Sequence, residues 1–323
     1  MISLGNSYRR YALTVDKINE YAKTSPEQFV HEAEKAYRAD IKETAKKIIN
    51  SPEKCRVVMF AGPSASGKTT TAKMIGEELE KLGTMAEIVS MDNFYLGEAR
   101  VPRTRDDRPD FECVEALDIP TIERCIGELL KTGETDIPTF NFAKSEPNPD
   151  TVHVSLKGGK IAIIEGIHAL NPIFTEHLRS TGGLQKIYIS VKQGIHKEKI
   201  KGYFVTACEL RLMRRLVRDC KFRGSNAEHT LGMWDNVLHG EKKYIVPYKY
   251  SGDITINSIH IYEPCLTAPM AADILSRVTP EHKDYAYARD LLERISQFNS
   301  IDPSIVPNDS LLREFIGKGK YKY

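Results

Sequence analysis

Short runs of consecutive apolar residues recur along the chain, with segments of helical period between several of them. The runs lie at Arg56–Ala61, Ala86–Met91, Lys160–Ile164, Lys186–Val191 and Asp253–Ile256. Continuous rather than alternating hydrophobicity is typical of strands that are buried on both faces, as in parallel sheets. Strands that alternate with helices therefore predict an α/β fold, with a doubly wound, mostly parallel sheet and helices on both of its faces.

Helical periodicity accounts for much of the remaining chain. Apolar residues at helical spacing predict helices over Phe29–Ile49, Ile119–Leu130 and Glu209–Cys220. Another helix is expected after the first strand, from a glycine-rich turn to about Leu82, with Gly83 as its terminator.

A capping box is expected where the first long helix begins. Ser25 can cap the helix, Pro26 suits its first position, and the Gln28 side chain can reach back to the cap. The sequence therefore predicts that a well-defined helix starts at this point.

These patterns divide the chain into a helical N-terminal prefix (1–54), a core (55–262) and a C-terminal helical extension (263–323). Two polar stretches that contain proline, Gly97–Asp110 and Lys144–Asp150, are expected to be loops. Long polar loops in a compact α/β unit often carry function.

The composition excludes several classes of protein. The 46 Lys+Arg and 44 Asp+Glu residues give a net charge of +2, so there is no global field for nucleic acid or a membrane surface. No apolar run approaches the ~20 residues of a membrane span, and the first residues lack the apolar segment of a secretory signal. The six cysteines form no CxxC pair. We expect a cytoplasmic protein with reduced thiols, no membrane partner and no direct indication of nucleic-acid binding.

The turn after the first apolar run fits the pattern G-x-x-x-x-G-K-[ST] in full. Its glycines let the backbone approach a ligand closely, so that backbone N–H groups and the N-terminus of the next helix can bind phosphates. Lys68 can reach the terminal phosphates, and the Thr69 hydroxyl can bind Mg²⁺. The residues expected to bind a nucleoside triphosphate are Gly62, Pro63, Ser64, Ala65, Ser66, Gly67, Lys68, Thr69 and Thr70.

Two carboxylates follow other strands. Glu165 ends the third apolar run and can serve Mg²⁺ together with Thr69, although a surface salt bridge would also explain it. Asp92 follows the second run, where ligands of open α/β sheets bind. It can orient or deprotonate an attacking hydroxyl, or it can simply cap a helix, and its spacing favours neither interpretation.

A basic helix supplies candidate cations. Its arginines, three and four positions apart, are Arg211, Arg214, Arg215 and Arg218. They can form a lid that closes over a triphosphate and stabilises charge during its transfer. Alternatively, they form a solvated face that pairs with Glu209 and Asp219.

Several motifs in this order resemble the uridine kinase/phosphoribulokinase family of P-loop kinases, and in particular the bacterial uridine kinase-like proteins. The resemblance extends from about Arg56 to Tyr262 and rests on GPSASGKTT (62–70), SMDNFY (90–95), DRPDF (107–111), IPTFNF (137–142), EGIHAL (165–170) and RLMRRLVRD (211–219). It implies a P-loop NTPase-type fold and an ATP-dependent kinase that uses Mg²⁺, with a second copy of the chain, in a homo-oligomer, as a candidate partner. The substrate that it implies is a nucleoside, with uridine or cytidine first.

The resemblance also implies roles for individual residues. Asp92 would act on the nucleoside 5′-hydroxyl, with Lys68 and the lid arginines Arg214, Arg215 and Arg218 as the other catalytic residues. Thr69 and Glu165 would serve the metal. The expected substrate contacts are Tyr95, Asp107, Phe140, Phe142 and Arg211.

The chain departs from the family at the positions that help to recognise the base. A histidine and an arginine of the family correspond here to Ser145 and Pro147, and a common tyrosine corresponds to Phe140. Loss of hydrogen-bonding partners weakens discrimination between substrates.

Two other functions therefore stay open. The first is a kinase for a sugar phosphate or a pantothenate-like alcohol, whose phosphate would need basic groups outside the lid. The residues available for that role are Arg100, Arg103, Arg105 and Arg108. The second is a nucleotide-sensing module with little catalysis.

Overall fold

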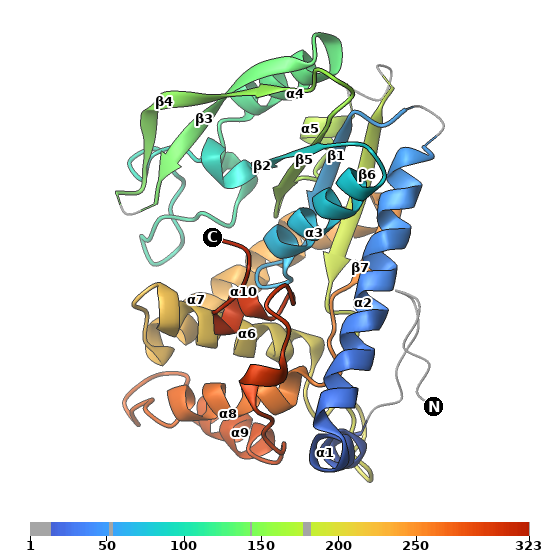
Figure 1. Ribbon diagram of the computed structural model, residues 1–323. Helices are drawn as coiled ribbons and strands as arrows, with labels where there is room; N and C mark the ends of the chain where they lie inside the picture. The colour runs from blue at the N-terminus through green and yellow to red at the C-terminus, as the bar shows by residue number, and fades with distance from the viewer. Residues whose placement is uncertain (1–13, 52–53, 143, 177–181, 323) are drawn as a thin grey trace.

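The computed structural model describes residues 14–51, 54–142, 144–176 and 182–322, so the first 13 residues of the predicted prefix lie outside the described part (Figure 1). A five-stranded parallel sheet forms the centre, with the strand order β2-β5-β1-β6-β7. Its strands are β1 (Val57–Ala61), β2 (Ala86–Ser90), β5 (Ile161–Gly166), β6 (Leu184–Ser190) and β7 (Ile254–Asn257). Each coincides with one of the five apolar runs, so the predicted α/β fold class is confirmed.

The side chains of the central strand alternate between two hydrophobic cores. Val58 and Phe60 point into one core, whereas Val57, Met59 and Ala61 point into the other. All five are buried, because helices cover both faces of the sheet. The first core is covered by α2 (Pro26–Ile49), α3 (Lys68–Lys81), α6 (Ala207–Phe222) and α8 (Glu263–Leu275), and the second by α4 (Ile119–Lys131) and α5 (Pro172–Thr175).

The remaining helices extend the first core. They are α1 (Val15–Thr24), α7 (Ala227–Gly240), α9 (Tyr285–Ile295) and α10 (Arg313–Ile316). Short 3-10 segments are η1 (Met91–Phe94), η2 (Val114–Ala116), η5 (Val246–Ser251) and η6 (Pro303–Ile305), and η4 (Glu241–Ile245) is a π-helical turn. In the described part of the chain, no helix combines the length and the hydropathy that crossing a membrane would require.

Both ends of the described chain are joined to the core through one buried carboxylate. Glu34 of α2 accepts hydrogen bonds from the Tyr262 hydroxyl, after β7, and from the Ser310 hydroxyl, each at 2.6 Å. Figure 1 shows the consequence: the C-terminal end, in red, returns to the middle of the molecule close to α3 and α6.

The loop predicted over Lys144–Asp150 is wrong, because most of it belongs to a β-hairpin. Strand β4 (Glu146–Ser155) pairs antiparallel with β3 (Glu134–Asn141). Both strands of a two-stranded sheet are edge strands, which is where sheets tolerate prolines such as Pro147 and Pro149. The other predicted loop, Gly97–Asp110, is largely irregular apart from isolated bridges.

The capping box predicted at Ser25 is also absent. Ser25 stands at the N-cap of α2, but its side chain makes no capping hydrogen bond. Its backbone N–H already donates to the carbonyl of Tyr21, because the same residue ends α1. A residue that is shared between two consecutive helices cannot offer that N–H to Gln28.

Candidate active site

The phosphate-binding loop lies between β1 and α3, where two glycines allow close backbone contacts. A Cβ on Gly62 would lie 2.3 Å from the carbonyl oxygen of Ile189 in β6. Gly67 has φ +84°, the left-handed region that glycine favours, and directly precedes α3. The backbone of the loop therefore leads directly into the N-terminus of α3, where backbone N–H groups can bind a polyphosphate.

Two residues at the start of α3 face the carboxyl end of β5. The Thr69 hydroxyl donates to Oε1 of Glu165 at 3.1 Å, and Nζ of Lys68 donates to the carbonyl of Pro63 at 3.2 Å. Gly166 follows Glu165, and a Cβ at this position would lie 2.6 Å from the Cβ of Met91. Close packing between the ends of β5 and β2 thus brings the two strand-end carboxylates, Glu165 and Asp92, into one site.

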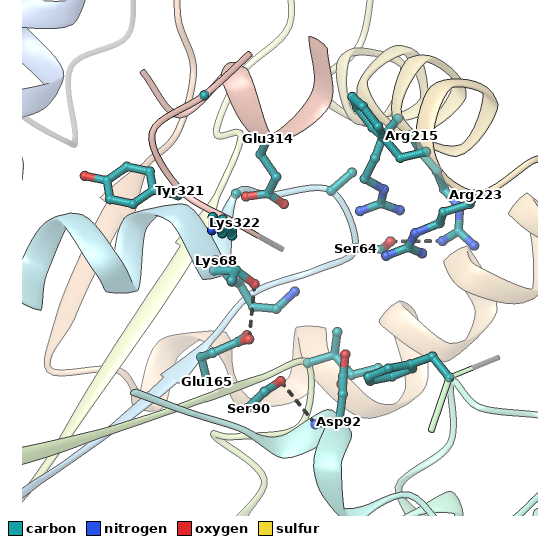
Figure 2. A pocket seen from close by; sticks show the side chains of 18 of the residues that line it. Ser64, Lys68, Ser90, Asp92, Glu165, Arg215, Arg223, Glu314, Tyr321 and Lys322 are labelled. Carbon is teal, nitrogen blue, oxygen red and sulfur yellow. Dashed lines mark hydrogen bonds between the residues drawn. The ribbon is translucent and has the colours of Figure 1, made fainter. Parts of the chain in front are cut away.

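Asp92 does not cap the turn in which it lies. Ser90 occupies the N-cap of η1, and its hydroxyl accepts the Asp92 backbone N–H at 3.3 Å. The Asp92 carboxylate instead lines the cavity together with Lys68, as Figure 2 shows. The N-cap interpretation of Asp92 is therefore wrong.

One large cavity, of about 1200 Å³, joins the phosphate-binding loop to Asp92. Next to Asp92 it is lined by an aromatic cluster, which consists of Tyr95, Phe111, Phe140 and Phe142. The rings contact one another edge to face, with centroids 5.2 Å apart for Tyr95–Phe111, 5.9 Å for Tyr95–Phe140 and 5.2 Å for Phe140–Phe142. Such a cluster offers a flat substrate ring an apolar wall.

Three carboxyl groups in the cavity, those of Glu165, Asp92 and Glu112, hold their protons more tightly than usual. Burial, reinforced by repulsion from Asp92, raises the pKa of Glu165 to about 7, and Lys68 opposes this shift. Burial also raises the pKa of Asp92 and of Glu112, against the nearby cations. Carboxyl groups with raised pKa values in a cleft are candidates for proton transfer or for binding a cation.

Helix α6 contributes two of its four predicted arginines to the cavity. Nη1 of Arg215 donates to the Ser64 hydroxyl at 2.9 Å, and Arg218 also lines the cavity. Both guanidinium groups pair with the buried carboxylate of Asp219, at 3.2 and 2.9 Å. Arg223 lies 3.7 Å from the same carboxylate. Asp219 thus holds three arginines together at the rim of the loop.

The other two arginines lie outside the cavity, on the inner side of α6. Arg214 is fully buried and forms a two-pronged ion pair with Glu263, at 2.5 and 2.6 Å. Arg211 donates to the Ser64 carbonyl at 3.0 Å and to Glu241 at 2.7 Å. The structure therefore places the expected lid residue Arg214 and the expected substrate contact Arg211 behind the loop, as supports.

The arginine-rich loop Gly97–Asp110 also stays out of the cavity. Asp107, an expected substrate contact, is exposed, has φ +56° and is not among the residues that line the cavity. Arg100, Arg103, Arg105 and Arg108, the basic groups that a phosphorylated acceptor would need, are also not among the residues that line the cavity.

Several lining residues were not predicted as site residues. They are Ser90, Phe111, Glu112, Ile167, Phe222, Arg223, Arg313, Glu314, Gly317, Lys318, Gly319, Tyr321 and Lys322. Ser90, Phe111 and Ile167 belong to motifs that carry the family resemblance and could have been found from them. The residues from 313 onward could not, because nothing local in the sequence links the C-terminal segment to the loop.

The donor set suits Mg²⁺ bound together with a nucleotide. Thr69 offers a hydroxyl, and Glu165 and Asp92 offer carboxylates, whereas the described residues contain no group of three or more His, Cys, Asp or Glu that could hold a metal alone. Mg²⁺ commonly takes one or two protein carboxylates and completes its shell with substrate phosphates and water.

A parallel α/β sheet, a complete phosphate-binding loop and strand-end carboxylates in one cavity define the class of P-loop kinases. Residues 57–263 match the model of the Phosphoribulokinase / Uridine kinase family, and the chain belongs to this family.

Curated relatives agree with this assignment at low identity. The chain is 28% identical over 218 residues to the uridine kinase of Lactobacillus helveticus. The aligned region covers 64% of this chain and 93% of the relative. It is 32% identical over 187 residues to the uridine kinase of Schizosaccharomyces pombe, which covers 57% of this chain but only 36% of that protein. Among solved structures, a possible uridine kinase from Bacillus stearothermophilus is similar, with a TM-score of 0.44 at 15% identity, over 68% of this chain and 98% of that one.

The Arg214–Glu263 ion pair leads to a test of whether Arg214 stabilises the fold or takes part in catalysis. Arg214→Met leaves a buried carboxylate without its partner, so the free energy of unfolding should fall by about 3–5 kcal/mol in urea titrations. As a control, Arg277→Met breaks the exposed pair with Asp273 and should cost less than about 1 kcal/mol. Arg214→Met with wild-type stability but without turnover would instead assign Arg214 to the chemistry.

The raised pKa of Glu165 predicts that stability depends on pH in metal-free protein. Between about pH 5 and 8 the folded state keeps protons that the unfolded chain has released, so the free energy of unfolding should fall as pH rises. Glu165→Gln cannot titrate and should flatten this slope in urea titrations with a chelator present. An equal slope in both proteins would show that Glu165 is not the group responsible.

Proposed function

We propose that this P-loop kinase transfers the γ-phosphoryl group of ATP to the 5′-hydroxyl of a nucleoside, with uridine or cytidine as the first candidates. The observation that carries the proposal is the single cavity in which Asp92 and the aromatic cluster lie next to the phosphate-binding loop. Family membership supports the kinase chemistry. The names of the relatives and the aromatic cluster support the nucleoside.

In the proposed reaction, a bond forms between the acceptor oxygen and the γ-phosphorus, and the bond from that phosphorus to the β,γ-bridging oxygen breaks. Asp92 orients the acceptor hydroxyl and takes its proton, while ADP carries away the electron pair of the broken bond. The raised pKa of Asp92 makes the carboxylate a better proton acceptor than an exposed aspartate.

Charge on the transferred group would be stabilised from the side of the loop. The side chains of Lys68 and Arg215 are hydrogen-bonded to Pro63 and Ser64 of the loop. They therefore already lie beside the loop and need little reorganisation when phosphates bind. Thr69 and Glu165 would hold Mg²⁺, which neutralises phosphate charge when bound. Arg218 completes the set of cations at the cavity.

The acceptor would lie against the aromatic cluster. Tyr95 is fixed for this role because its hydroxyl donates to the carbonyl of Phe111 at 3.1 Å. Ser145 also lines this end of the cavity, whereas Pro147 does not. The short Ser145 hydroxyl reaches fewer atoms of a base than a histidine would. We therefore expect the protein to distinguish one base from another less well than it distinguishes nucleosides from other alcohols.

The test of this function is a coupled assay of ADP release with a panel of nucleosides, sugar phosphates and pantothenate-like alcohols. Turnover with pyrimidine nucleosides supports the proposal. Turnover with another alcohol and none with any nucleoside would replace the substrate. ATP binding without turnover of any acceptor would favour a nucleotide sensor.

The role of Asp92 can be tested by removing its charge alone. Asp92→Asn should lower kcat by about 10²–10⁴-fold, because the amide cannot accept the hydroxyl proton. ATP affinity measured by calorimetry should stay within a few-fold of wild type, since the phosphates bind at the loop. A variant with unchanged kcat would remove Asp92 from the mechanism.

A further inference from the structure

The C-terminal segment, residues 310–322, is built into the wall of the active-site cavity. Leu311, Leu312 and Phe315 are fully buried. A Cβ on Gly67 of the phosphate-binding loop would come within 2.5 Å of Cδ1 of Leu311, so the segment packs directly on that loop. It is a fixed part of the site, although it lies outside the region that matches the family model.

Polar contacts fix the same segment to the helix that follows the loop. Glu314 accepts the Thr70 hydroxyl at 2.5 Å, and Lys320 pairs with Glu77 at 2.6 Å. The backbone N–H of Thr70 also donates to Glu314, at 3.4 Å. The segment is therefore anchored to the first turn of α3.

The cavity is larger than one small ligand requires. Its volume of about 1200 Å³ exceeds the roughly 300–1,000 Å³ of common single-ligand pockets. Besides the aromatic cluster near Asp92, it has two further aromatic residues, Phe222 at the end of α6 and Tyr321 of the C-terminal segment. Figure 2 shows Tyr321 and Glu314 on the opposite side of Lys68 from Asp92. Aromatic side chains of this cavity therefore come from three places: the aromatic cluster near Asp92, the end of α6 and the C-terminal segment.

Phe222 has the features of a platform for a planar ring. It is 56% exposed although it is large and apolar, and it lines the cavity. The tip of its ring rests on Gly317, which has φ +83° and where a Cβ would lie 2.7 Å from Cζ of Phe222. Nζ of Lys221 donates to the carbonyl of Ile316 at 3.3 Å, which ties the end of α6 to this turn. The ring is therefore held in place while part of its surface stays open.

The charges around Phe222 suit a ligand that joins a planar ring to phosphates. Arg218, Arg223 and Lys318 line the cavity together with it. A nucleoside triphosphate combines both features. Its base can stack on an aromatic side chain whichever base it is, because every base has a planar π-face.

We propose that Phe222, supported by Gly317, stacks the base of the phosphoryl-donor nucleotide, so that the C-terminal segment completes the donor site. The inference rests on the proposed kinase function and adds a donor-base site to it. It assigns the aromatic cluster near Asp92 to the acceptor alone.

The test compares the binding of Mg·ATP and of magnesium tripolyphosphate, which has no base, to the full-length protein by calorimetry. Phe222→Ala should weaken ATP binding about tenfold or more and leave tripolyphosphate binding unchanged. Because Phe222 is exposed, its truncation leaves no buried cavity. Tyr250→Ala, which removes a more exposed aromatic ring (87%) outside this cavity, is the matched control and should bind both ligands like wild type.

Unchanged ATP affinity in Phe222→Ala would overturn the inference, and so would an equal loss for both ligands, because the effect would then concern the phosphates or the fold. Phe222→Leu keeps an apolar side chain without a ring and should lose ATP affinity like Phe222→Ala. Wild-type affinity in Phe222→Leu would overturn stacking. Failure of the wild-type protein to bind either ligand would remove the kinase function itself, which separates the two proposals.

Discussion

The site depends on a phosphate-binding loop whose backbone packs against its surroundings without intervening side chains. Gly62 leaves no room for a Cβ beside the Ile189 carbonyl, and Gly67 leaves none beneath Leu311. The loop is therefore held from β6 on one side and from the C-terminal segment on the other. Its conformation is fixed before any ligand arrives, which lowers the reorganisation needed to bind phosphates.

Helix α6 links this loop to the rest of the molecule. Its inner side braces the loop through the bonds of Arg211 and Arg214 to the carbonyls of Ser64 and Ala65. Its other side brings Arg215 and Arg218 to the cavity, next to a buried aspartate that offsets their mutual repulsion. The same helix therefore sets the shape of the loop and the charge in front of it.

How much of the fold and of the site could be predicted depends on whether the residues that determine each feature lie close together in the sequence. Strand identity and the meeting of Lys68 with Asp92 follow from apolar runs and from the topology of parallel sheets. Arg214 and Arg215 are neighbours on one helix, and spacing alone cannot say which faces the ligand. The choice is made by Glu263, 49 residues after Arg214 in the chain. The hairpin strand β4 was missed because its prolines and mostly exposed residues carry the composition of a loop.

The acidic groups of the cavity determine which form of a nucleotide it can accept. Burial raises the pKa values of Asp92 and Glu165, and repulsion from Asp92 raises the pKa of Glu165 further, so adding negative charge beside them is unfavourable. A free nucleotide would bring that charge to the same place. A nucleotide that carries a divalent cation brings less, and its cation can be met by Glu165, which is already aligned by Thr69. This balance of charge supports the proposal that the nucleotide binds together with Mg²⁺.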